Sequence, residues 1–238
     1  MGGDVVFLLV SFLAAIGATL AGFGSSTLLI PVAVSFFDIK MAVFLVACFH
    51  LFNNLFKIRI FRRKIDFRTF ILFGIPSIIF AFIGARFITV IPLDTVRIIL
   101  GAFLIFYALF TLVKPKFSVK ENKSNAFIGG SLSGLLAGLI GMGGAIRSSF
   151  LVAFSLPKEV YIATSALIAV VIDLTRIPTY MFTRAVEWSP EFILIPLLVI
   201  SAYFGVRIGK ILLNKIDQET FRRIVSVALL LAGIKIMF

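Results

Sequence analysis

Cysteine and histidine are almost absent from this chain. Among its 238 residues there is one cysteine, Cys48, and one histidine, His50. A single cysteine excludes an intramolecular disulfide and a cysteine-based metal site, and a single histidine excludes a histidine cluster. An intramembrane enzyme needs clustered acids, histidines, or a nucleophile with its base, whereas the acidic residues here are scattered. We therefore expect no enzymatic activity, no metal and no cofactor.

Charged residues are also scarce. They make up 14% of the chain, against 61% for hydrophobic residues, and the mean hydropathy is +1.13. Soluble globular domains have about a quarter of their residues charged, so this composition indicates an all-α, polytopic membrane protein. The formal net charge is +12. Because the basic residues cluster between apolar segments, as in cytoplasmic loops of membrane proteins, nucleic-acid binding is not expected.

Long apolar runs fill most of the sequence. A helix needs about 20 apolar residues to cross a bilayer, and eight runs approach or reach that length. The first run follows Asp4 and lacks a basic segment before it, so we expect a membrane segment rather than a cleaved signal peptide. The predicted spans are Val5–Ala21, Ala42–Phe56, Phe67–Thr89, Val96–Val113, Ala126–Ile140, Val160–Thr175, Phe192–Ile208 and Ile224–Met237.

Two glycine-rich stretches interrupt these apolar runs. They are Ala21-Gly22-Phe23-Gly24-Ser25-Ser26 and Ile140-Gly141-Met142-Gly143-Gly144-Ala145, and each precedes an apolar piece of half length, Thr27–Phe37 or Ala145–Phe154. Irregular backbone is tolerated at membrane depth only where protein or a watery cavity satisfies its polar groups. Matching breaks in two halves of a chain indicate a transporter's binding site.

The chain also repeats itself. We predict a first transmembrane repeat at residues 1–113, a cytoplasmic linker at 114–125 and a second transmembrane repeat at 126–238. The order of the matching motifs is the same in both halves, so the similarity goes beyond composition. The pairs are Gly22-Phe23-Gly24 with Gly141-Met142-Gly143, Ile65-Asp66-Phe67 with Val186-Glu187-Trp188, Gly84-Ala85-Arg86 with Gly205-Val206-Arg207, and Asp94-Thr95-Val96-Arg97 with Glu219-Thr220-Phe221-Arg222.

Loop charges predict how the repeats are oriented. Lysine and arginine in short loops mark the cytoplasmic side, which places the loop from Lys57 to Arg68 and the central linker inside. In the second half the loop around Arg184 and Glu187 is not basic, whereas the next loop is, so the second half is predicted to be inverted. Full crossings and re-entrant hairpins at the breaks both fit these charges, and a parallel arrangement stays open as the alternative.

These motifs together resemble the TauE/SafE sulfite-exporter family of anion transporters. The resemblance covers nearly the whole chain, and it implies transport of sulfite, thiosulfate, sulfonates or other small organic anions across the cytoplasmic membrane. The first break has fewer glycines than the family favours, and Arg147 stands where the family usually has an apolar run ending in proline. The residues that carry the resemblance are Gly22, Gly24, Pro31, Ile65-Asp66-Phe67, Gly84-Ala85-Arg86, Gly141-Met142-Gly143-Gly144, Ala163-Thr164-Ser165, Val186-Glu187-Trp188 and Gly205-Val206-Arg207.

The breaks are suited to holding an anion. The first backbone N–H groups of a helix are unpaired and carry partial positive charge, and glycine lets an anion approach them closely. The alternative is that these glycines only allow close helix packing. The resemblance adds the Thr-Ser step of the predicted span Val160–Thr175. The predicted substrate-binding residues are Gly22, Gly24, Ser25, Ser26, Thr27, Gly141, Gly143, Gly144, Arg147, Ser148, Thr164 and Ser165.

Arg147 is the most informative single residue, because a charge at membrane depth is costly and usually functional. A guanidinium binds oxyanions through a bidentate fork. The alternatives are a structural pair with Asp173 or a side chain that reaches the membrane interface. Asp173 and Arg176 are three residues apart and are expected to share a helical face. The residues considered for proton coupling or gating are His50, Asn53, Asn54, Asp173 and Arg176, with structural roles as the alternative.

The sequence therefore predicts a multi-pass protein of the cell membrane that transports a small anion by alternating access. No Gly-x-x-x-x-Gly-Lys-Ser/Thr motif is present, so direct use of ATP is not expected. The alternatives are an anion channel and a structural membrane subunit. The expected partners are the anionic substrate and membrane lipid, and a homodimer is left open.

Overall fold

The computed structural model describes residues 2–21, 24–61, 65–114, 120, 122–151, 156–212, 230, 231, 234 and 236. Those residues form helices joined by short turns, and none of them forms a strand. The first half contains α1 (Gly2–Ala21), α2 (Ser25–Ala33), α3 (Ile39–Phe61), α4 (Phe67–Thr69), a π-helical turn (Phe70–Gly74), α5 (Ile75–Val90) and α6 (Leu93–Val113). The second half contains α7 (Lys123–Ile140), α8 (Gly143–Leu151), α9 (Lys158–Phe182), a 3₁₀ turn (Pro190–Ile193) and α10 (Leu194–Leu212).

Six helical stretches in this part of the chain are long and apolar enough to cross a membrane. They are Gly3–Leu20, Ile39–Phe61, Phe67–Val90, Leu93–Phe110, Glu159–Phe182 and Pro190–Leu212. The predicted span Ala126–Ile140 forms helix α7 but is not among the six, and most of the predicted span Ile224–Met237 lies outside the described residues. The protein is therefore a polytopic helical membrane protein, and a total of eight spans stays a prediction.

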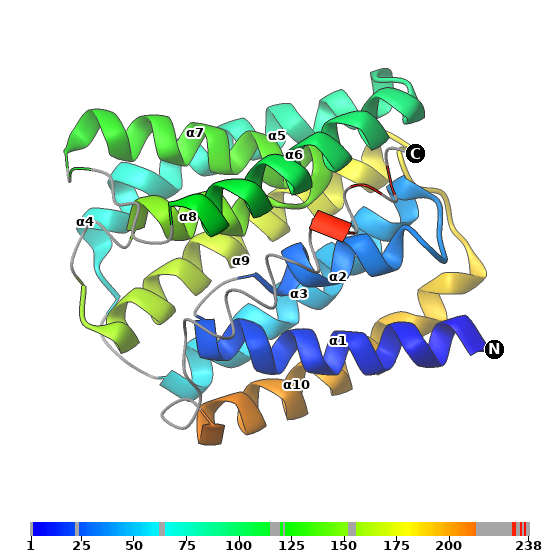
Figure 1. The fold of residues 1–238 in the computed structure, drawn as a ribbon, viewed down its shortest axis with the longest axis horizontal. Helices are drawn as coiled ribbons and strands as arrows, with labels where there is room; N and C mark the ends of the chain where they lie inside the picture. Colours follow the sequence, from blue (N-terminus) through cyan, green and yellow to red (C-terminus); the bar gives the residue numbers. More distant parts are fainter. Residues whose placement is uncertain are drawn as a thin grey trace.

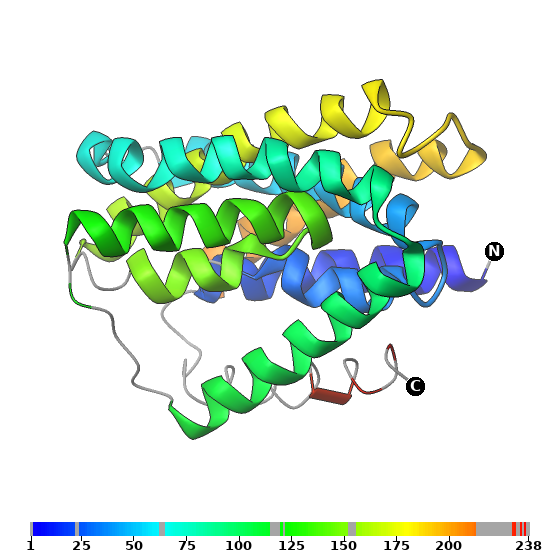
Figure 2. The same cartoon turned by 90° about the horizontal axis from the view of Figure 1, so that it is seen from above.

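The two halves have the same order of helices. A long helix, a helix of nine residues and a second long helix follow one another as α1, α2 and α3, and again as α7, α8 and α9. The packing also corresponds: α1 contacts α10 and α7 contacts α5, while α3 contacts α9 and α2 contacts α8. Along the long axis of the molecule, α1 and α3 run from right to left in Figure 1, whereas α7 and α9 run from left to right. Seen from above, α6 crosses obliquely at the edge of the bundle (Figure 2).

Close backbone contact joins the halves. A Cβ atom on Gly134 or Gly138 of α7 would lie 2.1 Å from the carbonyl oxygen of Ser77 or Ala81 on α5, so no side chain fits at either position. Small residues four apart are typical of tightly packed membrane helices. On the opposite side, a Cβ on Gly205 of α10 would lie 2.5 Å from the Cβ of Ala15 on α1. The glycines thus set the close approach of α5 to α7 and of α1 to α10.

Two helices continue past the basic residues at which the predicted spans end. Helix α3 runs to Phe61 rather than Phe56, and α9 runs to Phe182 rather than Thr175. Lys57 was predicted to begin a cytoplasmic loop, but it lies inside α3 with 2% of its surface exposed. That prediction is wrong, because protein contacts bury the side chain in a way that local composition does not reveal.

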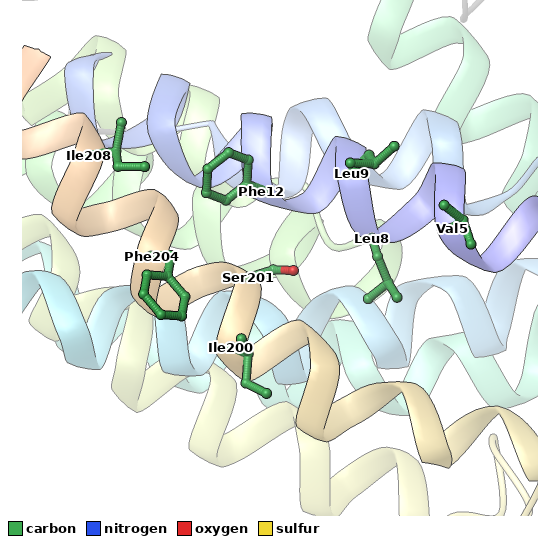
Figure 3. A pocket seen from close by; sticks show the side chains of 8 residues that line it. All are labelled: Val5, Leu8, Leu9, Phe12, Ile200, Ser201, Phe204 and Ile208. Carbon is green, nitrogen blue, oxygen red and sulfur yellow. The ribbon is translucent and has the colours of Figure 1, made fainter.

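A groove of about 450 Å³ lies between α1 and α10 on the outside of the bundle (Figure 3). Its lining is apolar and includes Leu9, Phe12, Ile200 and Phe204, with Ser201 as a polar exception. None of the predicted substrate-binding residues lines it. Its apolar lining suits lipid chains rather than an anion, so the candidate site lies elsewhere.

Candidate functional site

The first break leaves open space in front of a helix N-terminus. Helix α1 ends at Ala21 and α2 begins at Ser25, as predicted. Gly24 precedes α2 with φ 96°, a left-handed conformation that favours glycine. Apart from its two chain neighbours, no atom of the described residues lies within 4 Å of a Cβ atom placed on Gly24. Gly22, which was predicted to bind substrate, lies outside the described residues.

The second break folds α8 back against α7. Gly141 ends α7 with φ 74°, and its N–H donates to the carbonyl of Ala137. Helix α8 begins at Gly143, one residue before the predicted start. The hydroxyl of Ser133 donates to the carbonyl of Gly143 at 2.9 Å, and a Cβ on Gly143 would lie 2.1 Å from the carbonyl oxygen of Ser133. The close contact requires glycine at this position.

The two breaks meet inside the molecule. A Cβ atom on Gly144 would lie 3.8 Å from the backbone nitrogen of Gly24 and 3.6 Å from Nη2 of Arg147. The N-terminus of α2, the N-terminus of α8 and a guanidinium group therefore surround one small region. Helix N-termini and arginine both favour anions, so this region is the candidate binding site.

Arg147 is buried without a carboxylate partner. Its side chain is 3% exposed, and its Nε donates to the hydroxyl of Ser165 on α9 at 3.0 Å. In the part of the chain that the structure describes, no Asp or Glu forms an ion pair with it. The alternative of an ion pair with Asp173 is not found among these residues, and a side chain at the membrane interface stays an alternative. Nη2 of the guanidinium lies on the side of Gly144.

Polar side chains of α2 and α3 complete the site. Asn53 on α3 donates through Nδ2 to the hydroxyl of Ser25 at 3.2 Å. Ser26, the next residue of α2, is also buried. Two buried atoms near this N-terminus, Oγ1 of Thr27 and Oδ1 of Asn53, have no hydrogen-bond partner among the described residues. The hydroxyl of Ser25 can donate as well as accept, so the amide of Asn53 can present its oxygen or its NH₂ group to a ligand. Unpaired buried polar atoms are costly and indicate a missing partner.

A buried network crosses between α3 and α9. His50 Nδ1 lies 2.7 Å from Oδ2 of Asp173, and Arg176 donates through Nε to Oδ1 of Asp173 at 2.8 Å. The predicted pairing of Asp173 with Arg176 on one helical face is confirmed. Arg176 Nη1 also donates to the carbonyl of Ala137 at 2.7 Å. Asn54 donates to the carbonyl of His50 within α3, so it holds the backbone rather than joining the two helices.

Lys57, which is not among the predicted site residues, is a buried polar residue near the first break. Its Nζ donates to the carbonyl of Ala18, near the end of α1, at 3.1 Å. Lys57 and Arg176 are 119 residues apart, as are Ala18 and Ala137, so the two cations make equivalent contacts in the two halves. The repeat register, which aligns Lys57 with Arg176, is the signal that identifies it.

Two predicted site residues make contacts at the periphery. The hydroxyl of Thr164 accepts from the backbone N–H of Asp66 at 3.0 Å and thereby joins α9 to the segment before α4. Ser148 and Tyr161 share a hydrogen bond of 2.6 Å between their hydroxyls. Ser165, through Arg147, is the member of the Thr-Ser step that has a hydrogen bond to the candidate site.

The fold and this site define a multi-pass membrane protein with two broken helices that meet at a positively charged region. The model of the sulfite exporter TauE/SafE family matches residues 7–236, so the chain belongs to that family. The chain is also similar to the probable membrane transporter protein YunE of Bacillus subtilis (strain 168), with 28% identity over 107 residues. This match covers 44% of the chain and 38% of that protein. The family is one of membrane transporters rather than enzymes.

Proposed function

We propose that this protein is a secondary transporter of the cell membrane that carries a small sulfur-containing or organic anion, in the class of sulfite, thiosulfate and sulfonates. The observation that carries the proposal is the meeting of Gly24, Gly144 and the unpaired Arg147 at the two breaks. The family membership supports the transport of an anion of this class.

The chemistry of the site suits an oxyanion. Backbone N–H groups at the starts of α2 and α8 supply donors with partial positive charge, and the hydroxyls of Ser25, Ser26 and Thr27 supply neutral ones. Arg147 supplies a full charge and a fork that matches two oxygens of the substrate. Because the groups are buried, their attraction for a charged ligand is stronger than in water. Thr27 would donate to the anion through its hydroxyl, and Asn53 would donate through its NH₂ group once its amide is turned so that Oδ1 accepts from Ser25.

We infer that the two halves form an inverted repeat that works by alternating access. The exchange of packing partners between halves and the opposite directions of α1 and α7 support this inference. The loop charges agree, since the basic loops of both halves would face the cytoplasm. In such transporters the two repeats rock about a site at the middle of the membrane, held by broken helices.

Coupling is proposed to involve His50 and Asp173. The pair connects α3 of one half to α9 of the other, so a proton on this pair would change a contact between the two halves. An imidazole can take up and release a proton, which suits a proton that moves in each cycle. The membrane potential, negative inside, would also favour outward movement of an anion.

Counterflow in proteoliposomes tests the proposal. Vesicles that contain the wild-type protein and are loaded with unlabelled sulfite or thiosulfate should accumulate the same labelled anion, with sulfate, short sulfonates and carboxylates as competitors. Arg147→Gln should reduce the rate of counterflow by about tenfold or more, because it removes one charge-assisted hydrogen bond to the anion. Arg207→Gln, an exposed arginine of α10, is the matched control and should transport normally. Absence of counterflow with every anion would contradict the proposal.

The same measurement separates a transporter from a channel. A carrier gives counterflow against the gradient of labelled anion and saturates with substrate, whereas a channel with the same site lets the labelled anion equilibrate. An anion current that does not saturate as the anion concentration rises would identify the protein as a channel.

A further inference from the structure

Two buried cations near the breaks lack a carboxylate partner. Arg147 and Lys57 are 3% and 2% exposed, and each repels the other electrostatically. Among the described residues, the ion pairs of Asp173 are with His50 and Arg176, and neither Arg147 nor Lys57 pairs with an acid. Arg176 is thus paired with Asp173, whereas no acid of the described residues forms an ion pair with Arg147 or Lys57.

Such an excess of buried charge is unfavourable unless something else balances it. Removal of an ion from water is costly, and two like charges within reach of one another add repulsion. In membrane proteins, ionisable groups at this depth normally pair with one another or line a substrate pathway. A negatively charged ligand that reaches both Lys57 and Arg147 would balance them.

The positions of α3 residues place Lys57 beside the site. Asn53 and Lys57 are four residues apart and share a face of α3, and Asn53 bonds to Ser25 at the start of α2. Lys57 reaches the end of α1 on the other side of the same break through its contact with Ala18. An ammonium group has three N–H donors, and among the described contacts one of them is used by Ala18, so the others can serve a ligand.

We propose that the site binds an oxyanion with two negative charges, and that Lys57 is its second cationic ligand beside Arg147. This inference rests on the proposed function, because it specifies the charge of the anion held at the same site. Arg147 and Lys57 bind oxygens of the anion, while Thr27 and Asn53 supply neutral hydrogen bonds. Thiosulfate, sulfate and fully ionised sulfite have the required charge, whereas alkyl sulfonates and carboxylates with one charge leave one cation unbalanced.

A competition experiment with matched anions tests the charge preference. In wild-type proteoliposomes under thiosulfate counterflow, sulfate should compete about tenfold or more strongly than methanesulfonate, because methanesulfonate has a methyl group in place of one charged oxygen. Equal competition by the two anions would overturn the inference. It would leave the proposed function intact, since thiosulfate counterflow would still occur, whereas absence of counterflow with all anions would contradict both.

Variants of Lys57 test which residue sets the preference. Lys57→Gln removes the charge but keeps a donor for Ala18, and it should reduce the sulfate-to-methanesulfonate ratio by about tenfold. Lys57→Arg keeps the charge and should keep most of the preference. Lys210→Gln is the matched control, because Lys210 also donates to a backbone carbonyl, that of Ile60 at 3.3 Å, but is exposed. The ratio is measured within each variant, so a lower yield of folded protein does not change it. An unchanged ratio in Lys57→Gln would exclude Lys57 as a ligand.

Discussion

Lys57 and Arg176 make the same contact from equivalent positions in the two halves. Each donates to the backbone carbonyl of an alanine near the end of the helix that precedes a break, Ala18 in α1 and Ala137 in α7. The C-terminal carbonyls of a helix carry partial negative charge, so a buried cation stabilises the point at which the helix stops. The two cations differ in their ion pairs. Arg176 pairs with Asp173, whereas no acid among the described residues pairs with Lys57.

A methyl group at Gly144 should block the site without unfolding the protein. Its Cβ would be 3.6 Å from Nη2 of Arg147 and 3.8 Å from the nitrogen of Gly24, which are ordinary contacts. Gly144→Ala should therefore keep the melting temperature of the purified protein but lower anion counterflow, since the methyl occupies the space between the two helix N-termini. Gly138→Ala is the contrast: its Cβ would be 2.1 Å from the carbonyl oxygen of Ala81, so the protein should be destabilised. Normal counterflow by Gly144→Ala would place the anion elsewhere.

Arg176 should matter for stability more than Arg147 does. Loss of one partner of a buried ion pair costs about 3–5 kcal/mol, so Arg176→Gln should lower the melting temperature strongly. Arg147→Gln removes an unbalanced charge and should leave the melting temperature unchanged or raise it, although transport falls. Thermal unfolding in detergent compares the two variants. Asp94→Asn, which breaks an exposed pair with Arg97, should have little effect on stability. Equal destabilisation by Arg147→Gln and Arg176→Gln would mean that Arg147 is structural.

His50→Gln should separate anion exchange from proton coupling. The side-chain amide of glutamine can still donate to Asp173, but it cannot take up a proton as an imidazole does. Net uptake driven by a pH gradient should therefore be lost. Counterflow, which needs no net proton movement, should continue at a rate near that of the wild type. Both activities are measured in the same proteoliposome preparation. Retention of pH-driven uptake in His50→Gln would show that His50 does not carry the coupling proton.

Thiol labelling tests the inverted arrangement of the halves. In a Cys48→Ser background, Glu187→Cys and Lys120→Cys each add one exposed thiol. A membrane-impermeant maleimide added to intact cells should label position 187 and not position 120, because the loop near Glu187 is predicted to be outside and the linker inside. In inside-out vesicles the pattern should be reversed. Labelling of both positions from the same side would mean that the inverted arrangement is wrong.

The sequence predicts the breaks well because glycine has a specific physical role there. Gly24 and Gly141 adopt left-handed conformations, and Gly143 lies where a side chain would clash with α7. The starts of α2 and α8 consequently fall within one residue of the predicted positions. The pairing of Asp173 with Arg176 is local, and its spacing on a helix predicts it.

Contacts between distant residues could not be predicted in the same way. His50 and Asp173 are 123 residues apart, and their bond depends on the packing of α3 against α9. Arg147 reaches Ser165 rather than Asp173 because α8 folds back toward α9, which loop charges and hydropathy do not specify. The prediction for Lys57 was wrong for a different reason. A lysine after an apolar run usually begins a loop, but Lys57 is part of helix α3.

The unequal hydrogen bonding at the two breaks has a mechanical consequence. The end of α7 is held by Arg176 at Ala137 and by the hydroxyl of Tyr180 at Gly138, and Ser133 fastens α8 to α7. At the end of α1, among the described contacts, Lys57 is the side chain that holds Ala18. Among the described contacts, the side-chain hydrogen bonds that hold α1 and α2, from Lys57 to Ala18 and from Asn53 to Ser25, are fewer than those that hold α7 and α8. The second hairpin would then serve as a fixed support, and the first as the moving arm that opens the site to one side of the membrane or the other.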